Sequence, residues 1–119
     1  MNKPKTLRQR VFLCHDLAGL KRMLARYDTR LLYRQALDVA DELDTGKLPP
    51  TWATAVMDEY SARCIEHTSV SDARVTIRNS TRPAALRLAL VRESRKGTAA
   101  RQGLLASLRS RIRTLEAVR

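Results

Sequence analysis

Apolar residues return at every third or fourth position near the start of this chain, and this spacing constrains the fold more than any other feature. The repeat, at alternating steps of four and three residues, consists of Leu13, Leu17, Leu20, Leu24, Tyr27 and Leu31. Such a stripe lies on one face of an α-helix, whereas a strand would show a period of two. The four glycines and four prolines are too few for the many turns of an all-β protein. The sequence therefore predicts an all-α fold of about five short helices.

The first two helices are expected to cover most of residues 5–46. The first spans about 5–27, and the second begins after Asp28 or Thr29 unless the first simply continues. Gly46 suits the left-handed position that follows a helix C-terminus. The end of the second helix is acidic, with Asp38, Asp41, Glu42 and Asp44. Because the helix macrodipole disfavours negative charge there, we expect an arginine beside this end.

A third helix is predicted after the two prolines at 49 and 50. Thr51 is its candidate N-cap, and the pattern fades at 67–69. Three such segments predict a small, near-neutral helical bundle over residues 1–67.

Nearly all of the net charge lies in residues 74–119. This segment holds 12 Lys or Arg against the two acids Glu93 and Glu116, whereas residues 1–73 hold 11 basic and 10 acidic side chains. Charge concentrated in this way is typical of a surface that binds a polyanion or an acidic protein. The expected contacts to nucleic acid or partner are Arg74, Thr76, Arg78, Arg82, Arg87, Arg92, Arg95, Lys96, Arg101, Arg109 and Arg113.

The basic region is expected to begin with a strand and continue with two helices. Residues 68–73 are small and polar and are interpreted as a linker, and the alternating, β-branched residues 74–78 are predicted as one short strand. Thr81 is the candidate N-cap of the next helix, and Gly97 and Thr98 separate it from the last. The last helix should bury one face, formed by Leu105, Leu108, Ile112 and Leu115. The sequence leaves open whether this region packs as one domain with the bundle.

The order of strand, helix, Gly-Thr turn and helix resembles a ribbon-helix-helix DNA-binding module over residues 74–117. The resemblance rests on Arg-Val-Thr-Ile-Arg at 74–78, the helix start near Pro83 and the break at Gly97. It implies that Arg74, Thr76 and Arg78 face the bases, with Val75 and Ile77 in the core. It also implies that backbone amides near Thr98 hold a phosphate. The ribbon of that family usually lies near the N-terminus, unlike here.

A second resemblance concerns the segment from Leu86 to Leu108, around the run LALVRESRKG at 88–97. It is similar to the basic tails of small phage and prophage accessory proteins. That resemblance implies a context and no particular activity.

No set of residues has the spacing of a catalytic or metal site. Cys14 and His15 are adjacent on a helix and point about 100° apart, so zinc ligation with Cys64 and His67 is not expected. The carboxylates Asp58, Glu59 and Glu66 are interpreted as a solvated helix face, because no nucleophile or phosphate loop accompanies them. We expect no enzyme activity, no metal and no cofactor.

The sequence thus predicts a non-enzymatic accessory or regulatory protein that contacts duplex phosphates through an Arg-rich C-terminal region. The five aromatic residues lie outside that region, which favours duplex DNA over stacked single strands. The alternative is a phage-type protein whose basic face binds and inhibits a host nuclease, helicase, polymerase or defence protein. The two separated cysteines suggest a reducing, cytoplasmic setting, and no apolar run is long enough for a membrane span. Homodimerisation is left open.

Overall fold

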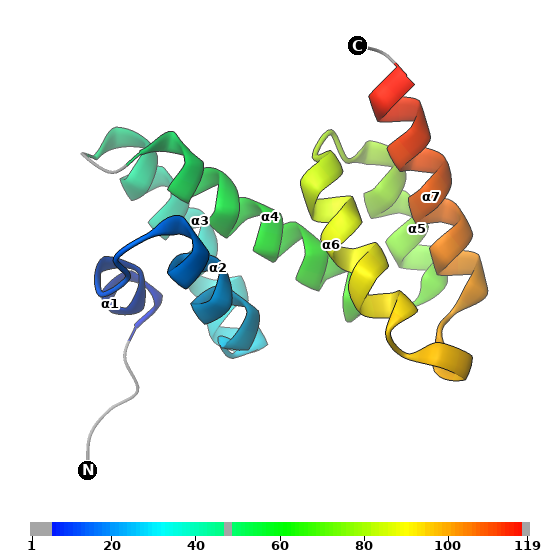
Figure 1. Cartoon of the computed structure of the whole chain (residues 1–119), viewed down its shortest axis with the longest axis horizontal. Coiled ribbons are helices and arrows are strands. Elements are labelled where there is room, and N and C mark those ends of the chain that lie inside the picture. Colours follow the sequence, from blue (N-terminus) through cyan, green and yellow to red (C-terminus); the bar gives the residue numbers. More distant parts are fainter. Residues whose placement is uncertain (1–5, 47–48, 118–119) are drawn as a thin grey trace. The chain divides into compact units, whose positions relative to one another are not determined.

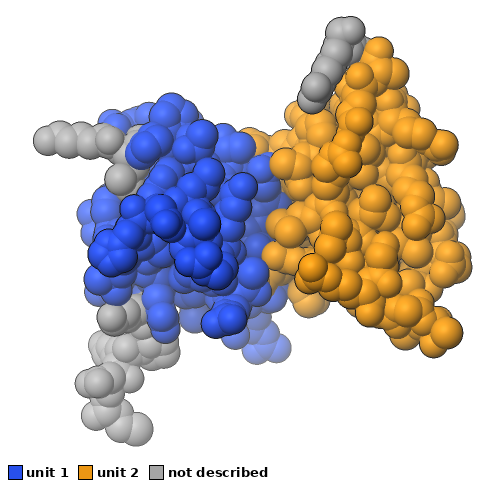
Figure 2. Space-filling view, viewed as in Figure 1, with its two compact units in different colours: residues 1–60 blue, residues 61–119 orange. Residues whose placement is uncertain are grey.

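The computed structural model of the chain describes residues 6–46 and 49–117, and helices dominate that part. It contains seven α-helices and one short 3-10 helix, and none of the described residues forms a strand. The chain divides into two compact units, residues 1–60 and 61–119, coloured separately in Figure 2. The all-α prediction is confirmed, and the helices are more numerous than the five expected.

Unit 1 is a helical cluster with an aliphatic core. Its helices are α1 (Leu7–Phe12), α2 (Leu17–Arg26), α3 (Thr29–Thr45) and the part of α4 (Pro50–Glu66) up to Tyr60, as Figure 1 shows. The buried side chains are Leu7, Val11, Leu20, Leu24, Leu32, Ala36, Val39, Ala40, Leu43, Trp52, Ala53, Ala55 and Val56. The helical periodicity of the sequence therefore identifies much of this core.

The single helix expected over 5–27 is instead two helices, and residue 5 lies outside the described residues. The side chain of Asp16 accepts a hydrogen bond from the Gly19 amide (2.7 Å), which caps α2 and interrupts the helical path. Leu13 falls in the break and is 57% exposed, although it continues the apolar stripe in the sequence. A good N-cap therefore overrides an unbroken apolar repeat here.

The acidic end of α3 has the arginine neighbour that the macrodipole argument predicts. Arg8 Nε donates to both carboxylate oxygens of Glu42, at 2.7 and 2.9 Å, and the Arg8 guanidinium lies 4.8 Å from the Phe12 ring centroid. The backbone amide of Leu7 also donates to Gln35 Oε1 (2.7 Å). These contacts tie α1 to α3.

Two expected helix ends in unit 1 differ in detail. Asp28 caps α3 as expected, but Gly46 has φ −93°, so it is not left-handed. α4 begins at Pro50, which makes Thr51 an internal residue instead of the N-cap. A proline is well suited to the first helical position because its missing N–H would have no helical partner there.

Unit 2 contains the remainder of α4 and three further α-helices. These are α5 (Val70–Asn79), α6 (Pro83–Ser94) and α7 (Gln102–Ala117), with the 3-10 helix η1 (Gly97–Ala99) before α7. Their shared core consists of Ala62, Ile65, Ala73, Ile77, Leu86, Ala89, Leu104, Leu108 and Ile112. Aliphatic side chains from four helices thus hold this unit together.

The predicted strand at 74–78 is wrong, because these residues belong to α5. The Ser69 side chain caps the helix by accepting from the Asp72 amide (3.2 Å), so Val70–Ala73 of the expected linker are also helical. Ala73 and Ile77, one turn apart, enter the core of unit 2. Burial of this pair outweighs the preference of β-branched residues for strands, which is modest.

The helix ends around α6 and α7 are shifted from their expected positions. Pro83 is in the first turn of α6, but the N-cap position is Arg82 and not Thr81. Gly97 follows the end of α6, as expected of a helix break, and has the left-handed φ of +60°, whereas Thr98 lies inside η1 and does not cap α7. The phosphate site expected at a helix start near Thr98 therefore lacks its helix.

Candidate nucleic-acid interface

All eleven candidate contact residues lie in unit 2, and eight of them fall into two groups. Four have their charge paired with a glutamate inside the unit, and four extend from it without a charged partner among the described residues. The distinction matters because an arginine already paired with a carboxylate attracts a phosphate less strongly than an unpaired one.

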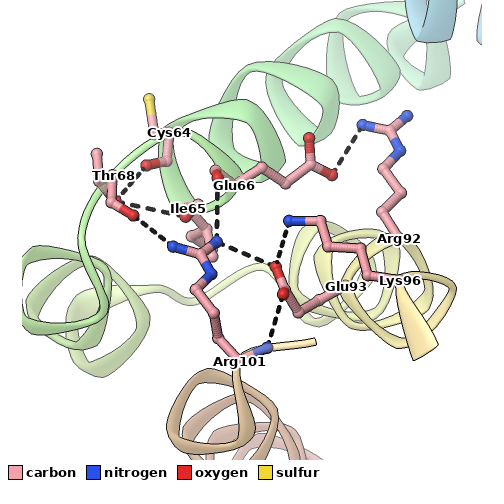
Figure 3. Close-up of polar contacts among 8 residues, drawn as sticks. All are labelled: Cys64, Ile65, Glu66, Thr68, Arg92, Glu93, Lys96 and Arg101. Atoms are coloured by element: carbon pink, nitrogen blue, oxygen red, sulfur yellow. Dashed lines mark hydrogen bonds and ion pairs between the residues drawn. The ribbon is translucent and has the colours of Figure 1, made fainter. Parts of the chain in front are cut away.

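The first group surrounds Glu93, a fully buried carboxylate on α6. Glu93 Oε1 accepts from Arg101 Nη2 (3.0 Å) and Lys96 Nζ (2.9 Å), and its Oε2 accepts from the Arg101 backbone amide (2.9 Å). Figure 3 shows the same guanidinium reaching the backbone carbonyls of Thr68 (2.7 Å) and Glu66 (3.0 Å). Arg101 therefore links the end of α4 and the end of α6 to the start of α7.

The pKa of Glu93 reflects this network. Burial by itself would raise the pKa, but the hydrogen bonds from the Arg101 side chain, the Arg101 amide and Lys96 outweigh it and lower the pKa to about 2. Glu93 is therefore ionised at neutral pH, and it neutralises charge that the sequence assigned to the binding surface.

Two further arginines of the candidate set also pair with acids. Arg92 Nη1 lies 3.3 Å from Glu66 Oε1, and Arg87 forms an ion pair with Glu116. Three of the four acids in residues 61–119 are thus paired with basic side chains, and the fourth, Asp72, lies in the first turn of α5.

The second group is exposed, and its side chains make no ion pair or hydrogen bond to any other residue that the structure describes. Its members are Arg78, Arg95, Arg109 and Arg113. Arg109 and Arg113 lie one turn apart on the exposed part of α7, along one flank of the buried stripe that includes Leu108 and Ile112. These cations are available to an external anion.

A hollow of about 390 Å³ lies between α5 and α7, and three arginines line it. We call it the α5–α7 hollow. Its lining residues are Arg74, Ile77, Arg78, Ala106, Ser107, Ser110, Arg111 and Thr114. Arg74 Nε donates to Ser107 Oγ (3.3 Å), and Arg111 Nε and Nη2 donate to the Ser80 carbonyl (3.2 and 2.9 Å). Both arginines are thus oriented by neutral acceptors, and no carboxylate lines the hollow.

Thr76 does not join Arg74 and Arg78, contrary to the ribbon interpretation. Alternate residues share a face in a strand, but in α5 Arg74 and Arg78 lie one turn apart while Thr76 is on the other flank of the buried stripe. Thr76 and Arg82 instead line a separate hollow of about 310 Å³. Val75, expected in the core, is 52% exposed, whereas Ile77 is buried as expected.

The candidate set omitted Arg111 and the hydroxyl residues of α7. Ser107, Ser110 and Thr114 recur at helical spacing on one side of the last helix, and Arg111 follows the same side. This signal was present in the sequence. This row could be recognised as one wall of a site only once residues 74–78 were known to be helical, because only in a helix do Arg74 and Arg78 lie on one side, facing the row.

Comparison with known proteins adds no relative: no protein-family model, no curated protein and no solved structure matches this chain. Within 6–46 and 49–117, no helix is both long and apolar enough to span a bilayer. In the same residues, no group of three or more His, Cys, Asp or Glu side chains is placed to hold a metal ion.

Proposed function

We propose that this chain is a non-enzymatic protein that binds duplex DNA through arginines of α5 and α7. The proposed contacts, called the arginine face below, are Arg74, Arg78 and Arg111 around the α5–α7 hollow, together with Arg109 and Arg113 on the other flank of the exposed side of α7. Arginine contacts to phosphate would supply the affinity, and no base-reading residue is assigned.

The observation that carries the proposal is the balance of charge left after the internal pairs of unit 2. Residues 61–119 contain 13 Lys or Arg and four Asp or Glu, a net charge of +9. Three of those acids are already paired with Arg87, Arg92, Lys96 and Arg101. The arginine face therefore retains its charge, and the like charges repel one another until an external polyanion neutralises them.

A duplex suits this face better than a single strand does. Proteins that hold single strands stack the bases on aromatic rings, and residues 61–119 contain no Phe, Tyr or Trp. Arginines on two neighbouring helices instead suit the regularly spaced phosphates of a duplex.

For the alternative partner, a host protein, the sequence contains a dense run of basic residues, the cluster Arg92, Arg95 and Lys96. Arg92 pairs with Glu66 and Lys96 with Glu93, so only Arg95 keeps an unpaired charge there among the described residues. This distribution favours a partner at the arginine face over one at that cluster.

A salt titration of duplex binding tests the proposal. If five arginines each neutralise one phosphate, the logarithm of the association constant should fall against log salt with a slope of roughly −4 to −5. A random-sequence duplex and fluorescence anisotropy suffice, with a poly-aspartate peptide as a control for simple charge attraction. A slope near zero, or no duplex binding at 50 mM salt, would refute the proposed function. Capture of one acidic protein from nuclease-treated lysate would then favour the alternative.

A further inference from the structure

We propose that the α5–α7 hollow is a discrete oxyanion site that holds a single phosphate group. This assigns different roles to the residues of the arginine face. The hollow would hold one phosphate in a fixed position, whereas Arg109 and Arg113 would attract the polyanion without a fixed contact. Only the identification of that phosphate with a DNA backbone rests on the proposed function.

The hollow brings together three guanidinium groups without an acid. Arg74 and Arg78 are one turn apart on α5, and Arg111 approaches from α7. Elsewhere in unit 2, Arg87, Arg92 and Arg101 are each paired with a glutamate. A concave surface concentrates the field of such charges and raises the local concentration of anions.

Two of the three guanidinium groups are held in position by neutral oxygens. Arg74 bonds Ser107 Oγ through Nε, and Arg111 bonds the Ser80 carbonyl through Nε and Nη2. Each guanidinium has five N–H donors, so donors remain for a ligand. Their positive charge is not reduced by these partners, and less side-chain freedom is lost when an anion binds.

The α7 wall of the hollow is built from small residues that allow a close approach. A Cβ atom added to Gly103 would lie 3.0 Å from Arg74 Nη2, so the Arg74 side chain extends along α7 at the position of this glycine. Ser110 and Thr114 continue the wall with hydroxyl groups, which donate hydrogen bonds to phosphate oxygens. Guanidinium and hydroxyl donors in one hollow match the acceptor-rich surface of a phosphate.

A hollow of similar size in unit 1 shows what the α5–α7 hollow lacks. It is about 400 Å³ and is lined by Arg10, Arg22 and Arg26, but the carboxylate of Asp28 also lines it. A carboxylate in the lining would repel a phosphate, so the site is assigned to the α5–α7 hollow alone.

The test is a titration of the full chain with inorganic phosphate, followed by NMR at the amides of Ser107 and Ser110 and at Arg74 Nε–H. Potassium chloride at matched ionic strength is the reference. We expect saturable shifts with phosphate only. Arg78→Gln should weaken phosphate binding about tenfold, because it removes one charged donor. The side chain of Arg78 makes no hydrogen bond or ion pair to the described residues, so its replacement leaves the internal contacts intact.

The matched control is Arg95→Gln, which removes another exposed, unpaired charge that lies outside the hollow and should leave phosphate binding unchanged. Equal shifts in phosphate and chloride, or equal weakening by the two variants, would overturn the oxyanion site. Adding unlabelled duplex then identifies the source of the phosphate. Displacement of inorganic phosphate supports a DNA backbone in the hollow, and phosphate binding without any duplex binding keeps the site and removes the proposed function.

Discussion

Replacing Glu93 with glutamine should destabilise unit 2 more than replacement of any other acid in it. Glutamine keeps the size and one acceptor of the side chain but removes the charge that Arg101 and Lys96 share. It also places an amide donor near the Arg101 guanidinium. Because Glu93 is fully buried, no water is at hand to replace the lost interaction.

The size of the effect follows from the pKa of Glu93. Although burial opposes ionisation, the hydrogen bonds lower the pKa from 4.5 to about 2, which corresponds to roughly 3 kcal/mol in favour of the folded state at neutral pH. The Lys96 and Arg101 side chains are 46% and 29% exposed, so solvent screens part of this energy. We therefore expect Glu93→Gln to lower the free energy of unfolding by about 2–3 kcal/mol at pH 7.

The pH dependence of the stability difference between wild type and Glu93→Gln is a second, independent test. Since the folded-state pKa lies below the unfolded value, the contribution of Glu93 is complete above about pH 5 and is lost as the pH falls toward 2. The difference between wild type and variant should therefore shrink by more than half between pH 7 and pH 3.

Urea denaturation followed by far-UV circular dichroism measures this effect, because unit 2 has no aromatic residue and Trp52 fluorescence reports on unit 1. Glu116→Gln is the matched control. It breaks a partly exposed pair with Arg87 and should cost about 0–1 kcal/mol. If the two variants were equally stable, or if the Glu93 difference did not change with pH, the network would not hold unit 2 together as described.

Two further substitutions test the local structure. Ile77→Ala should lower the free energy of unfolding by about 2–5 kcal/mol, because it opens a cavity in the core of unit 2. Val75→Ala, at a half-exposed position, should change it by less than about 0.5 kcal/mol. Similar losses for the two variants in urea denaturation would favour a strand at 74–78 over α5. Gly97→Ala should cost about 1 kcal/mol in thermal unfolding. The cost comes from the backbone φ of +60°, because nothing lies within 4 Å of the added methyl group. Gly97→Asn should cost less, and an unchanged melting temperature for Gly97→Ala would contradict the left-handed conformation.

The sequence is informative about helix cores and less so about where helices stop. Leu20 and Leu24 of the first repeat and the face from Leu105 to Ile112 are buried as their periodicity predicts, and Leu17 is partly buried. The break before α2 was missed because one Asp16 cap interrupts an otherwise continuous apolar stripe. A cap is formed by a single side-chain hydrogen bond to a backbone amide. Whether an aspartate forms that bond or stays inside a longer helix is seen only in the folded structure.

The strand error at 74–78 had the largest consequence for the candidate site. Alternation of Val75, Thr76 and Ile77 suggested a strand, but the burial of Ala73 with Ile77 requires the neighbouring helices to be known. The same error concealed the α5–α7 hollow, whose walls come from residues 33 positions apart, such as Arg74 and Ser107. The sequence likewise cannot distinguish Arg101, which is held by Glu93, from Arg78, which is not.

The most direct test of the arginine face compares two triple variants that remove the same charge. The first replaces exposed, unpaired arginines of unit 2 with glutamine: Arg78, Arg109 and Arg113. The second replaces exposed arginines of unit 1 in the same way: Arg22, Arg26 and Arg30. Both lower the net charge from +11 to +8.

Duplex affinity measured against salt separates them. We expect the unit 2 variant to bind at least tenfold more weakly at low salt and the magnitude of its log-log slope to fall by about three. The unit 1 variant should keep the wild-type slope. Equal losses in the two variants, or a larger loss in the unit 1 variant, would contradict the claim that the arginine face of α5 and α7 is where this chain meets nucleic acid.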